Sequence, residues 1–108
     1  MNEDTDFSKY GKSFQETLAH IIFEDRPFSD QIEEVLDINF FELKYLRVFV
    51  DKVFQYKQKY EVQPSPDAMQ TIIRTDLEDE NEATQKQVRD YFIKISTLEA
   101  RDTDYIKE

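Results

Sequence analysis

The amino-acid sequence predicts an all-α fold, a compact bundle of about five helices around a central helix at 41–60, with a long C-terminal helix. The chain has one glycine and three prolines in 108 residues, whereas β-sandwiches and barrels need many tight turns. Hydrophobic residues make up 39% and aromatic residues 14%, which is too much apolar material for a disordered chain. One helical domain is therefore expected at 13–98, followed by a C-terminal extension at 99–108.

The first helix is expected at 13–24, after a flexible polar lead-in at 1–12. Ser13 and Glu16 have the spacing of a capping box, in which hydroxyl and carboxylate satisfy the first free N–H groups of a helix. The helix cannot continue through Pro27, because proline restricts the residue before it and clashes with the preceding turn. The residues expected to face the core are Phe14, Leu18, Ile21 and Ile22.

A short second helix is expected at 28–37, and the central helix follows at 41–60. Asn39 and Glu42 repeat the capping-box spacing at the start of the central helix. At about 100° per residue, its apolar side chains fill an arc of roughly 180°, so several other elements must pack around it. The second helix gathers Phe28, Ile32, Val35 and Leu36 on one side. The arc of the central helix consists of Leu43, Tyr45, Leu46, Phe49, Val50, Val53, Phe54, Tyr56 and Tyr60.

A fourth helix starts after a proline-rich loop, with Ser65 as its cap and Pro66 at its first position. Leu77 is expected to close it. Acidic residues then crowd into 76–82, where their like charges resist burial and predict a solvated turn. The same acids favour the start of the next helix, because the helix dipole attracts negative charge there. The residues expected to face inward on the fourth helix are Met69, Ile72 and Ile73.

The fifth helix is expected to begin near Asn81–Glu82 and to run for about 25 residues at helical spacing. The supporting i,i+4 ion pairs expected on it are Glu82/Lys86 and Asp90/Lys94. Its apolar stripe consists of Val88, Tyr91, Phe92, Ile95 and Leu98, and continues through Tyr105 and Ile106 with Asp102 as an interruption. An overhanging apolar stripe must meet something, either another copy or a missing part of the chain. The candidate interaction residues are Tyr91, Leu98, Tyr105 and Ile106.

Composition excludes several classes of protein. The chain has no cysteine, so it offers no disulfide framework, thiol catalyst or thiolate zinc site. Its net charge of −10 repels phosphate backbones, so we expect no direct binding of DNA or RNA by this domain alone. The acidic N-terminus is unlike a signal peptide, and no apolar run approaches the roughly 18–20 residues of a membrane helix. We therefore expect a soluble intracellular protein without membrane contact.

Motifs for catalysis or for cofactor binding are weak. Gly11-Lys12-Ser13 resembles the end of a phosphate-binding loop, but Asp6 occupies the place of the first glycine and no apolar strand precedes it. His20 is the only histidine and falls away from the apolar stripe of its helix, so we expect it at the surface. Metal sites and general bases need several convergent groups. We expect no catalytic residue, no metal and no cofactor.

An acidic run and a set of aromatic residues could each indicate ligand binding, but a structural role explains both better. An EF-hand loop starting at Asp76 needs glycine at its sixth position and glutamate at its twelfth, and the chain has Asn81 and Gln87 there. A solvated acidic turn is the better interpretation. The Phe and Tyr residues of the third and fifth helices could stack nucleic-acid bases, but their helix-core spacing and the acidic charge favour core packing.

Several segments together resemble the N-terminal domain of DnaB-like replicative helicases, most closely the phage type. The resemblance covers about 13–98. It rests on the run Phe14-Gln15-Glu16-Thr17-Leu18-Ala19-His20-Ile21-Ile22, on Phe28, Ile32, Val35-Leu36 and Asn39-Phe40, on Val48-Phe49, and on Pro64-Ser65-Pro66-Asp67. The chain departs from the family at Tyr45, which stands where that family has a histidine five residues after Phe40.

The resemblance implies a non-catalytic collar domain of a hexameric, ATP-driven DNA helicase in the cytoplasm of a bacterium or phage-infected cell. Such a domain associates with neighbouring copies and contacts a primase or helicase loader, and a helical hairpin after the globular part carries much of the association. The chain ends where that hairpin would begin. It contains no ATP-binding loop, so ATPase activity is expected only of a full-length parent.

Two other classes of function remain open from the sequence. A free-standing acidic inhibitor or adaptor of phage type could mimic the charge of nucleic acid, as the net charge of −10 suggests. The acid is unevenly spread, however, because 41–60 carries five basic and two acidic residues. A small hydrolase is the third possibility, and no catalytic constellation supports it.

Overall fold

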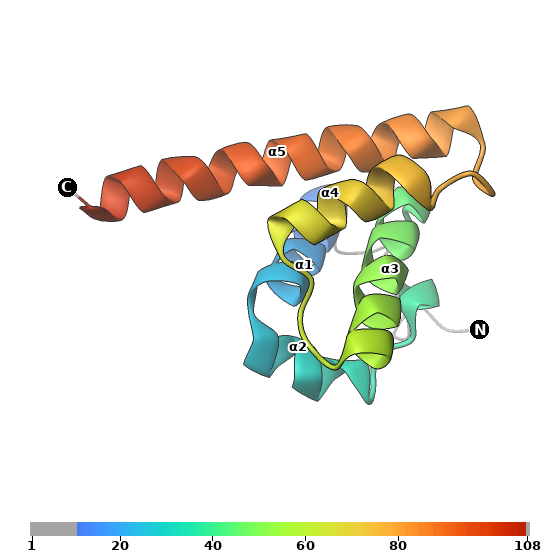
Figure 1. Cartoon of the computed structure of the whole chain (residues 1–108), viewed down its shortest axis with the longest axis horizontal. Helices are drawn as coiled ribbons and strands as arrows, with labels where there is room; N and C mark the ends of the chain where they lie inside the picture. The colour runs from blue at the N-terminus through green and yellow to red at the C-terminus, as the bar shows by residue number, and fades with distance from the viewer. Residues whose placement is uncertain (1–10, 108) are drawn as a thin grey trace. The chain divides into compact units, whose positions relative to one another are not determined.

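The chain is all-α in the computed structural model, which describes the backbone of residues 11–107 and the side chains of 11–97. This part contains five α-helices and one 3₁₀ turn and no strand, as the sequence predicts. The helices belong to two compact units, which divide between Ser65 and Pro66 (Figure 1). The first unit contains α1 (Gly11–Glu24), α2 (Arg26–Glu33), the 3₁₀ turn η3 (Ile38–Phe40) and α3 (Lys44–Tyr60). The second contains α4 (Pro66–Thr75) and α5 (Glu82–Lys107).

Helix α1 ends where the sequence predicts, but among the residues predicted to face the core only Ile22 is fully buried. Phe14 and Ile21 are 41% and 39% exposed, and Ser13 lies inside the helix, so it is not its cap. The buried face carries Gln15, Ala19, Ile22 and Phe23. This face packs against α2 and α3. A small alanine allows close approach of the helices, and the buried glutamine is used as a hydrogen-bond acceptor.

The second helix is shifted toward the N-terminus from its expected range of 28–37. The Asp25 carboxylate accepts a hydrogen bond from the Phe28 N–H at 3.1 Å and caps α2. Pro27 is tolerated in the first turn, because the N–H it lacks has no partner there in any helix. The helix ends at Glu33, and Val35 is left 78% exposed.

The start of α3 is capped by another helix, not by its own sequence. The expected capping box of Asn39 and Glu42 is absent: Asn39 belongs to η3, and Leu43 at the N-cap makes no side-chain cap bond. Instead, Gln15 Oε1 of α1 accepts hydrogen bonds from the N–H groups of Glu42 at 2.9 Å and Leu43 at 3.3 Å. Arg47 donates to the Phe41 carbonyl at 2.8 Å and orders the same segment.

Helix α3 supplies most of the core of the first unit, as predicted. Its Phe49 ring meets the Phe23 ring of α1 edge to face, with centroids 5.7 Å apart. Tyr60 differs from the expectation, since it is 52% exposed and lies against Tyr56. The buried residues of α3 are Tyr45, Leu46, Val48, Phe49, Val50, Val53, Phe54 and, unexpectedly, Lys57.

The second unit is a helical hairpin whose boundaries follow the sequence closely (Figure 1). Helix α4 begins at Pro66, and the Asn81 side chain caps α5 by accepting from the Thr84 N–H at 2.7 Å. Helix α5 is 26 residues long. On its surface Lys86 pairs with Asp90 at 2.7 Å, which replaces both predicted ion pairs. The buried residues of this unit include Met69, Ile73, Leu77, Val88, Tyr91 and Ile95.

Replacing Phe49 with alanine should lower the free energy of unfolding by about 3–5 kcal/mol, because a fully buried ring is lost and a cavity remains. Urea unfolding monitored by circular dichroism measures the change. Val35→Ala, at an exposed site, serves as the control and should stay within about 0.5 kcal/mol of the original chain. An unchanged midpoint for Phe49→Ala would contradict the central position of α3.

Replacing Gln15 with alanine should cost about 1–3 kcal/mol, because two N–H groups at the start of α3 lose their acceptor. The matched control is Gln58→Ala, at an exposed position of α3. Hydrogen exchange adds a local readout, since the Glu42 and Leu43 amides should lose protection before the rest of α3. Equal stability of the two variants would show that the cap is dispensable.

Candidate functional site

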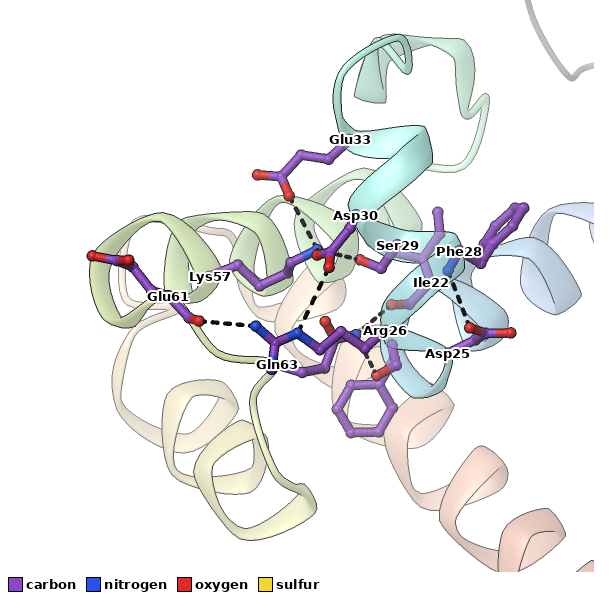
Figure 2. Close-up of polar contacts among 11 residues, drawn as sticks. Ile22, Asp25, Arg26, Phe28, Ser29, Asp30, Glu33, Lys57, Glu61 and Gln63 are labelled. Atoms are coloured by element: carbon purple, nitrogen blue, oxygen red, sulfur yellow. Dashed lines mark hydrogen bonds and ion pairs between the residues drawn. The ribbon is translucent and has the colours of Figure 1, made fainter.

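A buried lysine forms the polar centre of the first unit (Figure 2). Lys57, in the last turns of α3, is 8% exposed. Its ammonium group lies 2.7 Å from Asp30 Oδ1 and 3.1 Å from Glu33 Oε1, and it donates to Ser29 Oγ at 2.8 Å. We call these four residues the Lys57 cluster. A lysine ammonium has three N–H donors, and here three protein oxygens surround it. The cluster therefore joins α2 to α3 and leaves no donor for a substrate.

Neighbouring polar contacts tie the chain after α3 to the same region (Figure 2). Arg26 lies 3.7 Å from Asp30 and donates to the Glu61 carbonyl at 3.2 Å. Glu61 is in the left-handed conformation that ends α3. The Gln63 amide donates to the carbonyls of Ile22 and Phe23 at 2.7 and 2.8 Å, and so caps the end of α1.

The electrostatics of the Lys57 cluster favour the charged form of the Asp30 carboxyl. The hydrogen bond from Lys57 is the main cause that lowers the pKa of Asp30 from its ordinary value of 3.8, and the charges of Lys57 and Arg26 act in the same direction. Desolvation opposes them. A carboxylate held in its charged form accepts hydrogen bonds but is a poor general base. The cluster is a structural element in this arrangement.

Tyr45 of α3 is joined to α1 by a partly buried hydrogen bond. Its hydroxyl donates to Glu16 Oε2 on α1 at 2.6 Å, and its side chain is buried. Burial raises the pKa of Tyr45 far above its usual value, and the carboxylate of Glu16 adds to the effect. The tyrosine thus keeps its proton near neutral pH. Glu16, expected in a capping box with Ser13, serves this contact instead.

The second unit carries an apolar groove between its two helices. It has a volume of about 180 Å³ and is lined by Gln70, Ile73 and Arg74 of α4 and by Arg89, Phe92 and Ile93 of α5. We call it the α4–α5 groove. Ile93 is 62% exposed at this groove. Arg74 and Arg89 are both exposed, and neither forms an ion pair with any residue whose side chain is described.

Of the four predicted interaction residues, the structure describes the side chain of Tyr91 alone. Tyr91 is 3% exposed, so its ring is part of the interior. The helix runs on to Lys107, but the side chains of Leu98, Tyr105 and Ile106 lie outside the described residues. Sequence reasoning missed Ile93. The signal was its position off the stripe of its own helix, because its neighbours three and four residues away are the polar Arg89, Asp90, Ser96 and Thr97.

The residues of the weak catalytic motifs lie on α1. Gly11-Lys12-Ser13 form the first turn of α1 and are exposed. His20 is partly exposed and hydrogen bonds to Glu24 at 2.8 Å, one turn later on α1. The described side chains include no group of three or more His, Cys, Asp or Glu that could hold a metal ion. No described helix has the length and apolar character needed to cross a bilayer.

No protein-family model, curated protein or solved structure matches the chain. Its function is therefore argued from its own side chains, and the two features to explain are the long helix α5 and the α4–α5 groove.

Replacing Asp30 with asparagine should reduce the loss of stability in acid. Because folding lowers the pKa of Asp30, its contribution is complete above the ordinary pKa of 3.8 and disappears as the pH falls through the lower folded value. Urea unfolding between about pH 6 and pH 2 should show a steeper decline for the original chain than for Asp30→Asn.

The control is Asp79→Asn, at an exposed carboxylate that has no ion pair with a described residue. It should keep the acid decline of the original chain. The same decline in all three proteins would refute the role assigned to the pair of Asp30 and Lys57.

Proposed function

We propose that the chain is a non-catalytic assembly and docking domain of a DnaB-like replicative helicase, which associates with copies of itself and contacts a primase or a helicase loader. An all-α chain with Pro66 starting a helical hairpin suits the resemblance in sequence. The single observation that carries the proposal is the length of α5.

Helix α5 is much longer than the helix beside it. At 1.5 Å per residue, its 26 residues extend about 39 Å, against about 15 Å for the 10 residues of α4. A helix of this length gains most of its stability from packing, because helix propensity alone is weak. The part of α5 beyond the reach of α4 needs packing from elsewhere, and we propose another helix as its source.

The sequence of α5 suits a second copy of the same helix as that partner. Its apolar positions alternate at spacings of three and four, which is the spacing of a coiled-coil seam. Val88, Tyr91 and Ile95 begin this pattern and are buried within the chain. Leu98 and Tyr105 continue it, with Asp102 as the one polar member. A single polar residue in such a seam selects the arrangement of the helices and lowers their affinity. We therefore propose reversible self-association through the C-terminal half of α5.

The alternative of an acidic inhibitor that mimics nucleic acid has less support. Mimicry needs carboxylates free to imitate phosphates, whereas Asp30 and Glu33 are paired with Lys57 and Asp90 is paired with Lys86. The acidic residues are densest in the turn at 76–82, where five of seven residues are acidic. The alternative predicts a monomer that competes with DNA for a basic protein.

Light scattering over a range of protein concentrations should detect a concentration-dependent dimer or larger assembly. Tyr105→Asp should weaken this association about tenfold or more, which is about 1.4 kcal/mol, because it places a charge in the seam. Asp102→Leu should strengthen it for the opposite reason. Circular dichroism should show that both variants keep their helices.

The matched control is Gln87→Asp, an equal change of charge at an exposed position of α5, which should leave the association constant unchanged. A monomer at every concentration would refute self-association. Docking is tested separately, by sedimentation of the chain mixed with a purified primase or a purified loader.

A further inference from the structure

We infer that the α4–α5 groove binds an amphipathic helix of a partner protein in which acidic residues flank the apolar anchors. The inference deepens the docking half of the proposed function and rests on it. It is independent of self-association through the end of α5.

The size and lining of the groove point to a side-chain anchor as its occupant. Pockets for drug-sized ligands and cofactors measure about 300–1,000 Å³, so a volume of about 180 Å³ is too small for them. The groove can hold one or two apolar side chains of a partner, as in complexes where a helix lies in a groove of its receptor. Ile73 is buried at 4% exposure and Ile93 is open at 62%. The groove thus has a buried apolar wall at Ile73 and an exposed apolar residue, Ile93, that a partner would cover.

Two arginines at the groove favour a partner with negative charge. Arg74 comes from α4 and Arg89 from α5, so a guanidinium from each helix lines the groove. Neither is paired with a described side chain, although the chain has 24 acidic and 14 basic residues. Lys86, on the same helix as Arg89, is paired with Asp90. Arginine binds carboxylates through two parallel hydrogen bonds, which makes glutamate or aspartate beside the anchors the matching chemistry.

A short acidic helix fits this groove better than a nucleic acid does. Two arginines neutralise about two phosphates, whereas duplex DNA carries a charge every ~1.7 Å and extends past the groove. The acidic turn at 76–82 leads into α5 and would repel those further phosphates. An acidic helix brings only a few carboxylates, so it meets less repulsion from the acids of the chain than a polymer of continuous negative charge does.

The test uses two synthetic helical peptides of about 20 residues, long enough to form a helix in part before binding. Both carry two leucines four residues apart, flanked by glutamates in one peptide and by lysines in the other. Fluorescence anisotropy with the intact chain should show about tenfold tighter binding of the glutamate peptide, and added salt should remove most of that difference. Equal binding of both peptides, or binding of neither, would overturn the inference.

Variants locate the site. Arg89→Glu should weaken the glutamate peptide about tenfold, and the double variant Arg74→Glu/Arg89→Glu should prefer the lysine peptide. Ile93→Ser should weaken both peptides. The matched control is Lys86→Glu, the same change of charge on the same helix but outside the groove lining, and it should have little effect. An equal loss in Lys86→Glu and Arg89→Glu would refute the groove as the site, since bulk charge would then explain the binding.

Two further measurements separate the possible outcomes. A single-stranded oligonucleotide that binds more tightly than the glutamate peptide, and loses affinity in Arg89→Glu, would assign the groove to nucleic acid and overturn the inference. Light scattering on the double variant should give the association constant of the original chain. If the chain self-associates but binds neither peptide, only the inference fails. If it binds the glutamate peptide as a monomer, the inference holds and self-association fails.

Discussion

The contact between Gln15 and the start of α3 is the constraint on which the first unit depends. No side chain near the start of α3 caps it, so two backbone N–H groups need an acceptor from elsewhere. The amide oxygen of a buried glutamine on α1 supplies it. This contact lies on the side of α1 that also buries Ala19 and Phe23, whereas Phe14 stays exposed.

The opposite end of α3 is held by charge. Lys57 is buried, and a buried ammonium is costly unless hydrogen-bond acceptors surround it. Residues of α2 provide three such oxygens. The capping glutamine and this lysine therefore fix α3 at its two ends, one against α1 and the other against α2. The polar groups of the Lys57 cluster bind one another and hold α2 to α3. The surface features that suit a partner are in the second unit.

The second unit presents apolar and charged side chains at its surface, beside the α4–α5 groove. Its helices leave Ile93 open and the guanidinium groups of Arg74 and Arg89 without described partners. Such groups cost little in water and become favourable only when a complementary surface covers them. The proposed assembly through the end of α5 and the proposed docking at the α4–α5 groove would use different segments of one helix, so they need not compete.

Local patterns in the sequence determined much of this protein. The all-α class, the end of α1 before Pro27, the start of α4 at Pro66 and the extent of α5 follow from spacing, proline and capping chemistry, which act over a few residues. Tertiary structure decided the inward face of α1, the cap of α3, the burial of Lys57 and the exposure of Ile93. The reason is physical: Gln15 bonds to residues 27 and 28 positions away, and Lys57 to one 28 positions away. Periodicity tells which residues share a face, but the partner of that face is set by contacts distant in the chain.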